Sequence, residues 1–144
     1  MITKLVPLER EHLDTLMARS VFPIALTPDL TRAYFSPGSV AYCLLEDGEP
    51  ALAGGIVNLG WNRGEAWMIP TPFLRNHLRF CLALIKKLLP AMAENYGFIR
   101  VQASCINDPS SKFAKGRGFE YEGTLKKFGP NGERCYMYSR IFER

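Results

Sequence analysis

The sequence predicts a single α+β domain over residues 1–144, an α/β/α sandwich in which a twisted sheet of six or seven strands, mixed but mostly antiparallel, carries helices on both faces. Two observations support this fold class. With 144 residues, 47% of them hydrophobic and 22% charged, the chain has the size and composition of one folded domain with its own core. The hydrophobic period also changes along the chain in the order strand, one or two helices, three strands, long helix, strand, short helix and two strands.

The first 38 residues predict a strand, a helix and a less regular segment. Residues 1–7 alternate apolar and polar positions and end at a proline, which favours a strand. Leu8–Arg19 places its leucines on one side of an amphipathic helix. Thr27–Phe35 is consistent with a short helix that has a threonine cap and a proline at its first position. A plain connecting loop explains the same residues equally well.

Residues 40–69 predict an antiparallel meander of three strands. The strands are Val40–Leu45, Ala51–Leu59 and Glu65–Ile69, and glycine-containing turns separate them. Gly54 and Gly55 lie inside the middle strand, where glycine indicates either a β-bulge or the close approach of a neighbouring backbone.

The second half of the chain predicts a long helix, a buried strand and a final hairpin. Phe73–Glu94 is expected to form one continuous helix because apolar residues recur at helical spacing on one face. These residues are Leu78, Leu82, Ile85, Leu89 and Met92. Phe98–Ile106 is apolar enough for a buried strand, whereas Tyr121–Phe128 and Arg134–Phe142 are expected to pair around an Asn-Gly turn.

The segment between the buried strand and the hairpin carries the most specific motif. Asn107 is a typical helix cap, a proline follows in the first turn, and Gly118 suits the left-handed position that ends a helix. Ser110 lies three residues after the asparagine, Phe113 six residues after it, and Phe119 directly after the glycine. This order resembles the fourth-helix motif of the GCN5-related N-acetyltransferases (GNAT). The predicted order of elements is similar to that family over nearly the whole chain.

The resemblance implies that the chain transfers an acetyl group from acetyl-coenzyme A (acetyl-CoA), bound as a cosubstrate, to an amine by direct attack. In the family the cosubstrate lies where the third meander strand separates from the next strand, here Glu65–Ile69 and Phe98–Ile106. Free backbone groups at such an opening can hold the pantetheine arm and polarise the thioester carbonyl. The cofactor-binding residues implied around this opening are Trp67, Met68, Ile69, Asn107 and Phe113.

The segment before the long helix departs from the family pattern. The family has a glycine-rich turn there that binds the pyrophosphate, but this sequence has no glycine from Glu65 to Tyr96. Because glycine lets a backbone come close to phosphate, we expect a degenerate pyrophosphate-binding loop. Arg75 and Arg79, four residues apart on the predicted helix, are candidates to bind the phosphates directly. Solvated surface arginines are an equal alternative.

Glu65 is the candidate general base. The reaction needs a group that removes a proton from the attacking amine, and family members often supply a carboxylate from the start of this strand. A surface carboxylate beside a turn is the alternative interpretation of Glu65. His77 and Cys105 are weaker candidates, because the helix face of the histidine is uncertain and an apolar strand usually buries a thiol in the core.

The group that protonates the leaving thiolate is less clear from the sequence. Many family members place a tyrosine seven residues after the asparagine, where this chain has Ala114. Tyr121 and Tyr138 are the main remaining candidates, with Tyr136 beside them. The alternatives are that the thiolate leaves unassisted or that no chemistry occurs.

Aromatic side chains are candidates to line an acceptor pocket, although core packing is the alternative for the tryptophan at mid-strand. These residues are Tyr34, Phe35, Trp61 and Trp67. The region from Ser20 to Gly38, which should select the acceptor, carries no motif that identifies it.

The charge is divided unevenly. Residues 1–72 carry five Lys/Arg and eight Asp/Glu, a net charge of −3, whereas residues 73–144 carry thirteen and six, a net charge of +7. A basic half favours an anionic ligand such as a nucleotide cofactor, and a solvated basic face is the alternative. A second interpretation is a catalytically degenerate GNAT-like structural or binding protein, similar to small internal proteins of phage particles. A nucleic-acid-binding module is weaker, because the basic residues are not interleaved with aromatics on one element.

The four cysteines are widely spaced, which predicts reduced core thiols and no metal site. The amino end lacks the apolar region of a signal peptide, and no apolar stretch reaches the roughly 20 residues of a membrane span. We therefore expect a cytoplasmic protein without a membrane partner. The sequence leaves the oligomeric state open, with a homodimer as one alternative.

Overall fold

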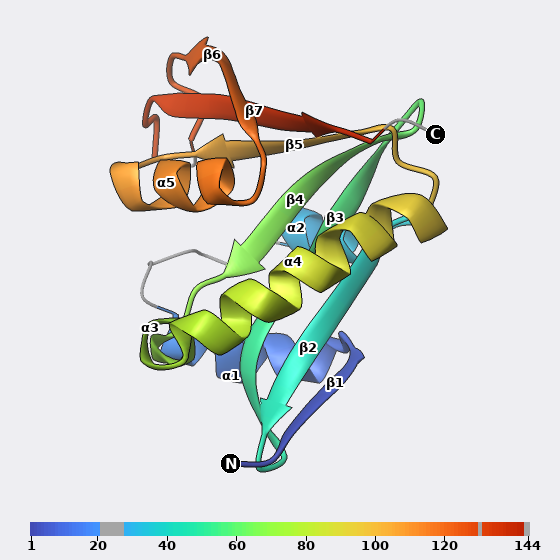
Figure 1. Ribbon diagram of the computed structural model, residues 1–144, viewed down its shortest axis with the longest axis vertical. Coiled ribbons are helices and arrows are strands. Elements are labelled where there is room, and N and C mark those ends of the chain that lie inside the picture. The colour runs from blue at the N-terminus through green and yellow to red at the C-terminus, as the bar shows by residue number, and fades with distance from the viewer. Residues whose placement is uncertain (21–27, 130, 143–144) are drawn as a thin grey trace.

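A computed structural model of the chain describes residues 1–20, 28–129 and 131–142. Seven strands in these ranges form one sheet in the order β1-β2-β3-β4-β5-β7-β6 (Figure 1). The strands are β1 (Thr3–Pro7), β2 (Val40–Glu46), β3 (Glu49–Gly60), β4 (Arg63–Ile69), β5 (Arg100–Cys105), β6 (Glu120–Leu125) and β7 (Cys135–Ile141). Neighbouring strands are antiparallel except β4 and β5, which are parallel. The predicted mixed, mostly antiparallel sheet is confirmed.

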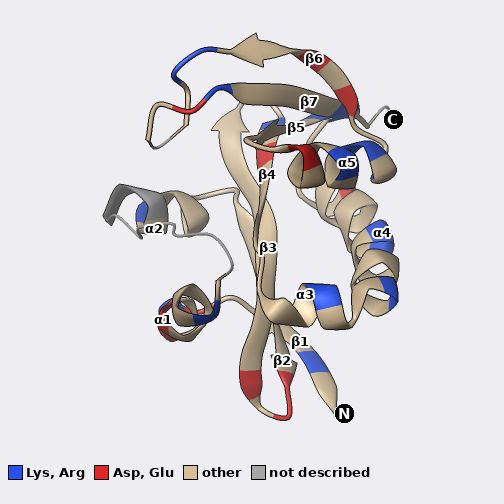
Figure 2. Ribbon diagram, turned by 90° about the vertical axis from the view of Figure 1, so that its left-hand side faces the viewer, with Lys and Arg blue, Asp and Glu red and all other residues tan. Residues whose placement is uncertain are grey.

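Helices cover both faces of the sheet, as predicted (Figure 2). One face carries α1 (Arg10–Arg19) and α2 (Pro28–Tyr34), and the other carries α3 (Pro72–Asn76), α4 (Leu78–Asn95) and α5 (Asp108–Gly116). We call these the α1/α2 face and the α4/α5 face. In the part of the chain that the structure describes, no helix is long and apolar enough to cross a membrane.

A layer of apolar side chains fills the space between the sheet and each set of helices. The cluster on the α4/α5 face includes Ile56, Ala93 and Phe98, and the cluster on the α1/α2 face includes Leu16 and Cys43. Fully burying an aliphatic or aromatic side chain of this size stabilises a fold by about 1.5–3 kcal/mol. All four cysteines are buried and free, as predicted, and burial raises the pKa of the Cys43 thiol to about 11.

The meander is built by two tight turns and one close backbone contact. Asp47-Gly48 and Trp61-Asn62 have positive φ angles at both central residues, which matches the twist of antiparallel strands. A Cβ atom on Gly55 would lie 2.0 Å from the carbonyl oxygen of Val40, so only glycine fits there. The register shifts lie elsewhere, between Leu44 and Leu45 and between Asn58 and Gly60. The close approach, and not the bulge, therefore explains this glycine.

The predicted continuous helix from Phe73 to Glu94 is wrong at its start. His77 has φ −130° and ψ 44°, which separates α3 from α4. The hydrogen-bond chain continues across this residue, because its N–H donates to Phe73 O (2.9 Å) and its carbonyl accepts from Cys81 N (3.0 Å). Cys81 is buried whereas Leu78 is 48% exposed, so Leu78 does not belong to the apolar face that its spacing predicts. The buried side chain of Phe73 places α3 against the end of the sheet at a different angle from α4.

The motif around α5 folds as predicted. Asn107 Oδ1 accepts the backbone N–H of Ser110 at 2.9 Å, and Ser110 Oγ accepts the backbone N–H of Asn107 at 3.3 Å, which forms a reciprocal cap. After the helix, Gly118 has φ +87° and donates to Lys115 O, while Phe119 N donates to Ala114 O. This hydrogen-bond pair is the Schellman arrangement that ends a helix at a glycine.

Candidate functional site

The parallel strands β4 and β5 diverge after three residue pairs. Arg63, Gly64 and Glu65 pair with Arg100, Val101 and Gln102, and the pairing then stops. β4 continues to Ile69 and β5 to Cys105, each paired only on its outer side, with β3 and β7 respectively (Figure 1). We call this opening the seam. Backbone N–H and C=O groups that point into it lack a strand partner, so they are available to a ligand.

Three sequence-predicted residues form the β4 side of the seam, and their side chains are committed to packing. Ile69 is buried on the α1/α2 face, and Met68 packs against the cluster around Phe73. Trp67 stacks on Tyr34 of α2 with ring centroids 3.8 Å apart and an angle of 11° between the planes. The indole Nε1 is buried and has no hydrogen-bond partner in the described ranges. These three residues can therefore contact a ligand in the seam mainly through their backbone N–H and C=O groups.

The β5 side of the seam leads directly into α5. Asn107 uses its side-chain oxygen in the helix cap, but its amide N–H groups have no hydrogen-bond partner among the described residues. Phe113 is half-buried on α5, and the guanidinium of Arg117 lies 5.4 Å from its ring centroid. Asn107 is thus placed at the open end of the seam with two free donors.

Glu65 occupies the last residue pair before the strands separate. Its Oε1 accepts a hydrogen bond of 3.3 Å from Nε2 of Gln102, the residue directly opposite on β5. Both side chains are half-buried and lie on the α1/α2 face. Sequence reasoning missed Gln102. The available signal was the only glutamine of the sequence, inside a strand that was predicted to be buried.

The two predicted tyrosines lie on the opposite face from Glu65. Tyr138 pairs with Ala103, the residue after Gln102, and side chains alternate along a strand. Tyr138 is only 4% exposed, whereas Tyr121, which meets it edge-to-face at 5.7 Å, is 54% exposed and shares a 2.6 Å hydrogen bond with Thr124 Oγ1. Ala114 belongs to the same buried cluster as Tyr138. The structure therefore brings together the two tyrosines but separates them from Glu65 by the thickness of the sheet.

Cys105 is not suited to act as a base. It is 4% exposed, and its Sγ contacts the carbonyl oxygen of Ser110 at 3.6 Å. Burial raises the pKa of this thiol, which keeps it protonated near neutral pH.

The link between β4 and α3 differs from the predicted phosphate site. Arg75 lies in α3 and Arg79 in α4, so the premise that they share one helix face is wrong, although both are exposed. Thr71 is buried and its hydroxyl donates to Ala51 O, which leaves α3 without a side-chain cap. His77 Nε2 lies 3.8 Å from an oxygen of Glu46.

Comparison with known proteins decides what kind of fold surrounds the seam. No protein-family model matches the sequence, and a comparison with curated proteins finds no relative. Among solved structures, Ard1 from Thermoplasma volcanium matches with a TM-score of 0.81 at 11% identity over 100% of both chains. The ribosomal-protein-S18-alanine N-acetyltransferase from Escherichia coli matches with a TM-score of 0.78 at 12% identity, over 99% of this chain and 96% of that chain. An acetyltransferase of the GNAT family from Streptococcus pneumoniae gives 0.73 at 15% identity, over 99% and 100%. The chain has the GNAT fold.

Within this GNAT fold, the two helix layers differ in charge. The helices α3, α4 and α5 carry six Lys/Arg and two Asp/Glu, a net charge of +4, whereas α1 and α2 carry three of each, a net charge of zero. The basic residues on the first layer are Arg75, Arg79, Lys86, Lys87, Lys112 and Lys115. Figure 2 shows these basic helices on one side of the sheet. An anionic ligand of this GNAT fold is therefore favoured on the α4/α5 face.

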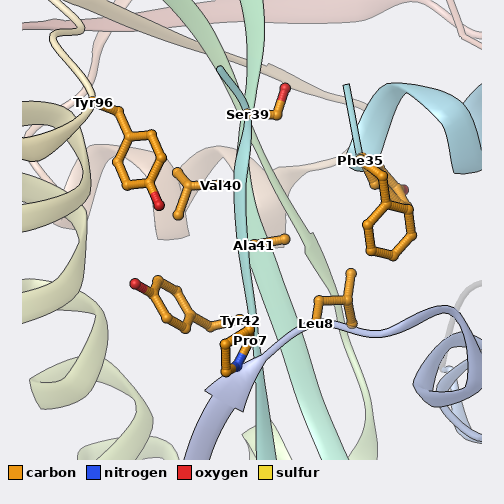
Figure 3. A pocket seen from close by; sticks show the side chains of 9 residues that line it. Pro7, Leu8, Phe35, Ser39, Val40, Ala41, Tyr42 and Tyr96 are labelled. Carbon is orange, nitrogen blue, oxygen red and sulfur yellow. The ribbon is translucent and has the colours of Figure 1, made fainter. Parts of the chain in front are cut away.

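Two surface hollows lie outside the seam. The larger, of about 460 Å³, lies between the end of α1 and the β4–α3 link and includes Thr71 and His77 in its lining. The smaller, of about 260 Å³, straddles the edge of β2, with Tyr42 and Tyr96 on the side of α4 and Phe35 on the side of α2 (Figure 3). Two strands separate β2 from the seam boundary, so the smaller hollow is not part of the same site.

Proposed function

We propose that this chain is an N-acetyltransferase that transfers an acetyl group from acetyl-CoA to an amine. The seam is the observation that carries the proposal, because it presents unpaired backbone groups beside the carboxylate of Glu65. The likeness of the fold to N-acetyltransferases and the basic helix layer on one face add support. Acetyl-CoA supplies the acetyl group as a thioester, which an amine can attack.

The residues around the seam fit an extended, amide-containing arm such as pantetheine. Unpaired N–H and C=O groups of residues 66–69 and 103–105 would hydrogen-bond it, and the free amide of Asn107 would add a donor at the open end. Phe113 on α5 would contribute an apolar contact. Arg75 and Arg79 would bind the phosphates from two separate helices instead of from a glycine-rich loop.

The proposed chemistry divides between the two faces of the sheet. On the α1/α2 face, the Glu65 carboxylate removes a proton from the amine, directly or through one water, as its nitrogen forms a bond to the carbonyl carbon. A backbone N–H in the seam stabilises the negative charge that develops on the carbonyl oxygen. The carbon–sulfur bond then breaks, and sulfur leaves with the electron pair. On the α4/α5 face, the hydroxyl of Tyr138, or of Tyr121 beside it, would return a proton to this thiolate.

The acceptor is proposed only as an amine that approaches from the α1/α2 face. Similar structures include enzymes described as acting on a ribosomal protein and on spermidine, both of which present amino groups. In this chain the stacked rings of Tyr34 and Trp67 lie on the same face as Glu65 and would form one wall of the acceptor site.

A non-catalytic binding or structural role is the second candidate, and one observation favours it. The β4–α3 link has a proline at the first position of α3, no side-chain cap and a helix break at His77, none of which helps a backbone bind pyrophosphate. Such a protein would keep the fold without using acetyl-CoA.

Thermal unfolding with acetyl-CoA separates the two candidates. A ligand that binds the native state raises the melting temperature by mass action, so an acetyltransferase should show a rise that saturates with acetyl-CoA. Release of free coenzyme A with a panel of polyamines, amino acids and peptide amino termini should then identify the acceptor. No shift at millimolar acetyl-CoA, together with no thiol release, would favour the non-catalytic role.

A further inference from the structure

Gln102 is the one side chain in the described ranges that hydrogen-bonds to the candidate base. It lies directly opposite Glu65 in the last pair before the seam opens, and its Nε2 donates to Oε1 at 3.3 Å. Because this is the last pair of the parallel ladder, the register of β4 and β5 fixes the position of Glu65 relative to Gln102. The carboxylate is therefore held at the point where the unpaired backbone begins.

The cationic side chains nearest in register are engaged elsewhere. Arg63 and Arg100 form a pair two residues earlier on the same strands, so they share the α1/α2 face with Glu65. Arg63 lies over the ring of Trp61 at 5.0 Å and donates to Gly60 O, whereas Arg100 forms a two-armed ion pair with Glu122. In the described part of the chain no Lys, Arg or His forms an ion pair with Glu65.

Glu122 and Glu65 differ in the group that donates a hydrogen bond to each carboxylate, and this difference indicates the role of Gln102. The guanidinium of Arg100 lowers the pKa of Glu122 to about 2, which makes that carboxylate a poor proton acceptor. A neutral amide donor can fix the orientation of a carboxylate with a much smaller electrostatic effect. The hydrogen bond to Oε1 also leaves Oε2 without a described partner.

We propose that Gln102 is a positioning residue that holds Oε1 of Glu65, so that Oε2 faces the seam as the proton acceptor. This inference rests on the proposed acetyltransferase function. Cys135 is a further titratable group near this carboxylate, since burial, then Glu133 and then Glu65 raise the pKa of the Cys135 thiol. A thiol contributes no positive charge.

Replacement of the amide tests the proposal through pH dependence. Gln102→Leu removes the donor, which makes the Glu65 carboxylate easier to protonate, so the acidic limb of the kcat/KM profile should move to higher pH. Gln102→Glu adds a second carboxylate and should move the limb further in the same direction. The value of kcat at the optimum should fall by up to about 100-fold in Gln102→Leu, because a displaced base loses its alignment, with KM for acetyl-CoA unchanged.

Asn95→Leu is the matched control, since it replaces an exposed amide at the end of α4, outside the seam. It should leave both the limb and kcat in place. A second readout does not need activity: a 13C NMR titration of the Glu65 side chain should show a higher midpoint in Gln102→Leu than in the wild type. An unmoved midpoint in folded Gln102→Leu would overturn the positioning role. Absence of acetyl transfer by the wild-type protein would instead reject the proposed function, which keeps the two failures distinct.

Discussion

The two faces of the sheet at the seam present different chemistry. The α1/α2 face has Glu65, Gln102 and the stacked rings of Tyr34 and Trp67, under helices with no net charge. The α4/α5 face has Tyr138, under helices with a net charge of +4. Because side chains alternate along a strand, adjacent residues of β5 serve opposite faces. In the proposed function, the seam therefore receives the anionic acetyl donor from the basic α4/α5 face and the amine acceptor from the α1/α2 face.

The largest expected effect on catalysis comes from a substitution on the α1/α2 face, which we call the acceptor face because the amine is proposed to approach from it. Glu65→Gln removes the proposed proton acceptor while keeping the size of the side chain, so kcat should fall by about 10²–10⁴-fold. The dissociation constant for acetyl-CoA, measured by calorimetry, should not change, because Glu65 does not lie on the basic face. If Glu65→Gln weakened acetyl-CoA binding by as large a factor as it lowers kcat, the proposed separation of base and acetyl-CoA between the two faces would be wrong.

Substitutions on the α4/α5 face, where acetyl-CoA is proposed to bind, should instead change the affinity for acetyl-CoA. Arg75→Ala and Arg79→Ala each remove a charge-assisted contact to phosphate and should weaken acetyl-CoA binding by roughly tenfold, about 1.4 kcal/mol. Arg10→Ala is the control, since Arg10 is an exposed arginine on α1. Titration calorimetry of the three variants tests the assignment. Unchanged affinity in both Arg75→Ala and Arg79→Ala would mean that these residues are solvated surface arginines that do not bind the phosphates.

The helix that borders the seam on the α4/α5 face should depend on its cap. Asn107→Ala removes the side-chain oxygen that accepts the backbone N–H of Ser110 and should lower the free energy of unfolding by about 1 kcal/mol. Asn107→Ser keeps a capping oxygen and should be close to the wild type. Urea unfolding measures both. If the serine variant is as unstable as the alanine variant, the cap is not what the asparagine contributes.

The smallest effect concerns the ion pair on the acceptor face. The hydrogen bond from Arg100, with a further one from Ser139, lowers the pKa of Glu122 to about 2 in the folded protein. A carboxyl with a lowered folded-state pKa stabilises the fold above its ordinary value of 4.5, and this contribution is lost as the pH falls from there towards 2. The pair is partly exposed, so the effect is modest. As the pH is lowered through this range, from about 5 to about 2, the melting temperature of the wild type should fall more steeply than that of Glu122→Gln. Parallel curves would contradict the linkage.

Local signals were enough to predict most of the fold. The order of strands and helices follows from the change in hydrophobic period, and the α5 motif follows from a cap and a glycine stop, both of which act within a few residues. The break at His77 was not predictable, because histidine is no helix breaker and the apolar spacing continues past it. The angle of α3 is set by where the ring of Phe73 is buried, which depends on the sheet.

The candidate site was predictable only in part. The seam followed from the resemblance, and Glu65 from its place on the third meander strand. Gln102 lies 37 residues away from Glu65 in the chain, and only the register of β4 on β5 brings the two together. The separation of Glu65 from Tyr138 likewise depends on which residue of β7 faces Ala103. Register across a crossover is a tertiary property, so no local pattern reveals it.

Amide hydrogen exchange tests the central claim, that acetyl-CoA binds in the seam. Backbone N–H groups in residues 66–69 and 103–105 that point into the opening have no strand partner and should exchange quickly in the free protein. Saturating acetyl-CoA should slow exchange in both segments while leaving β1 unchanged, and Arg75→Ala should raise the concentration required. Unaltered exchange in both segments at millimolar acetyl-CoA would contradict the account.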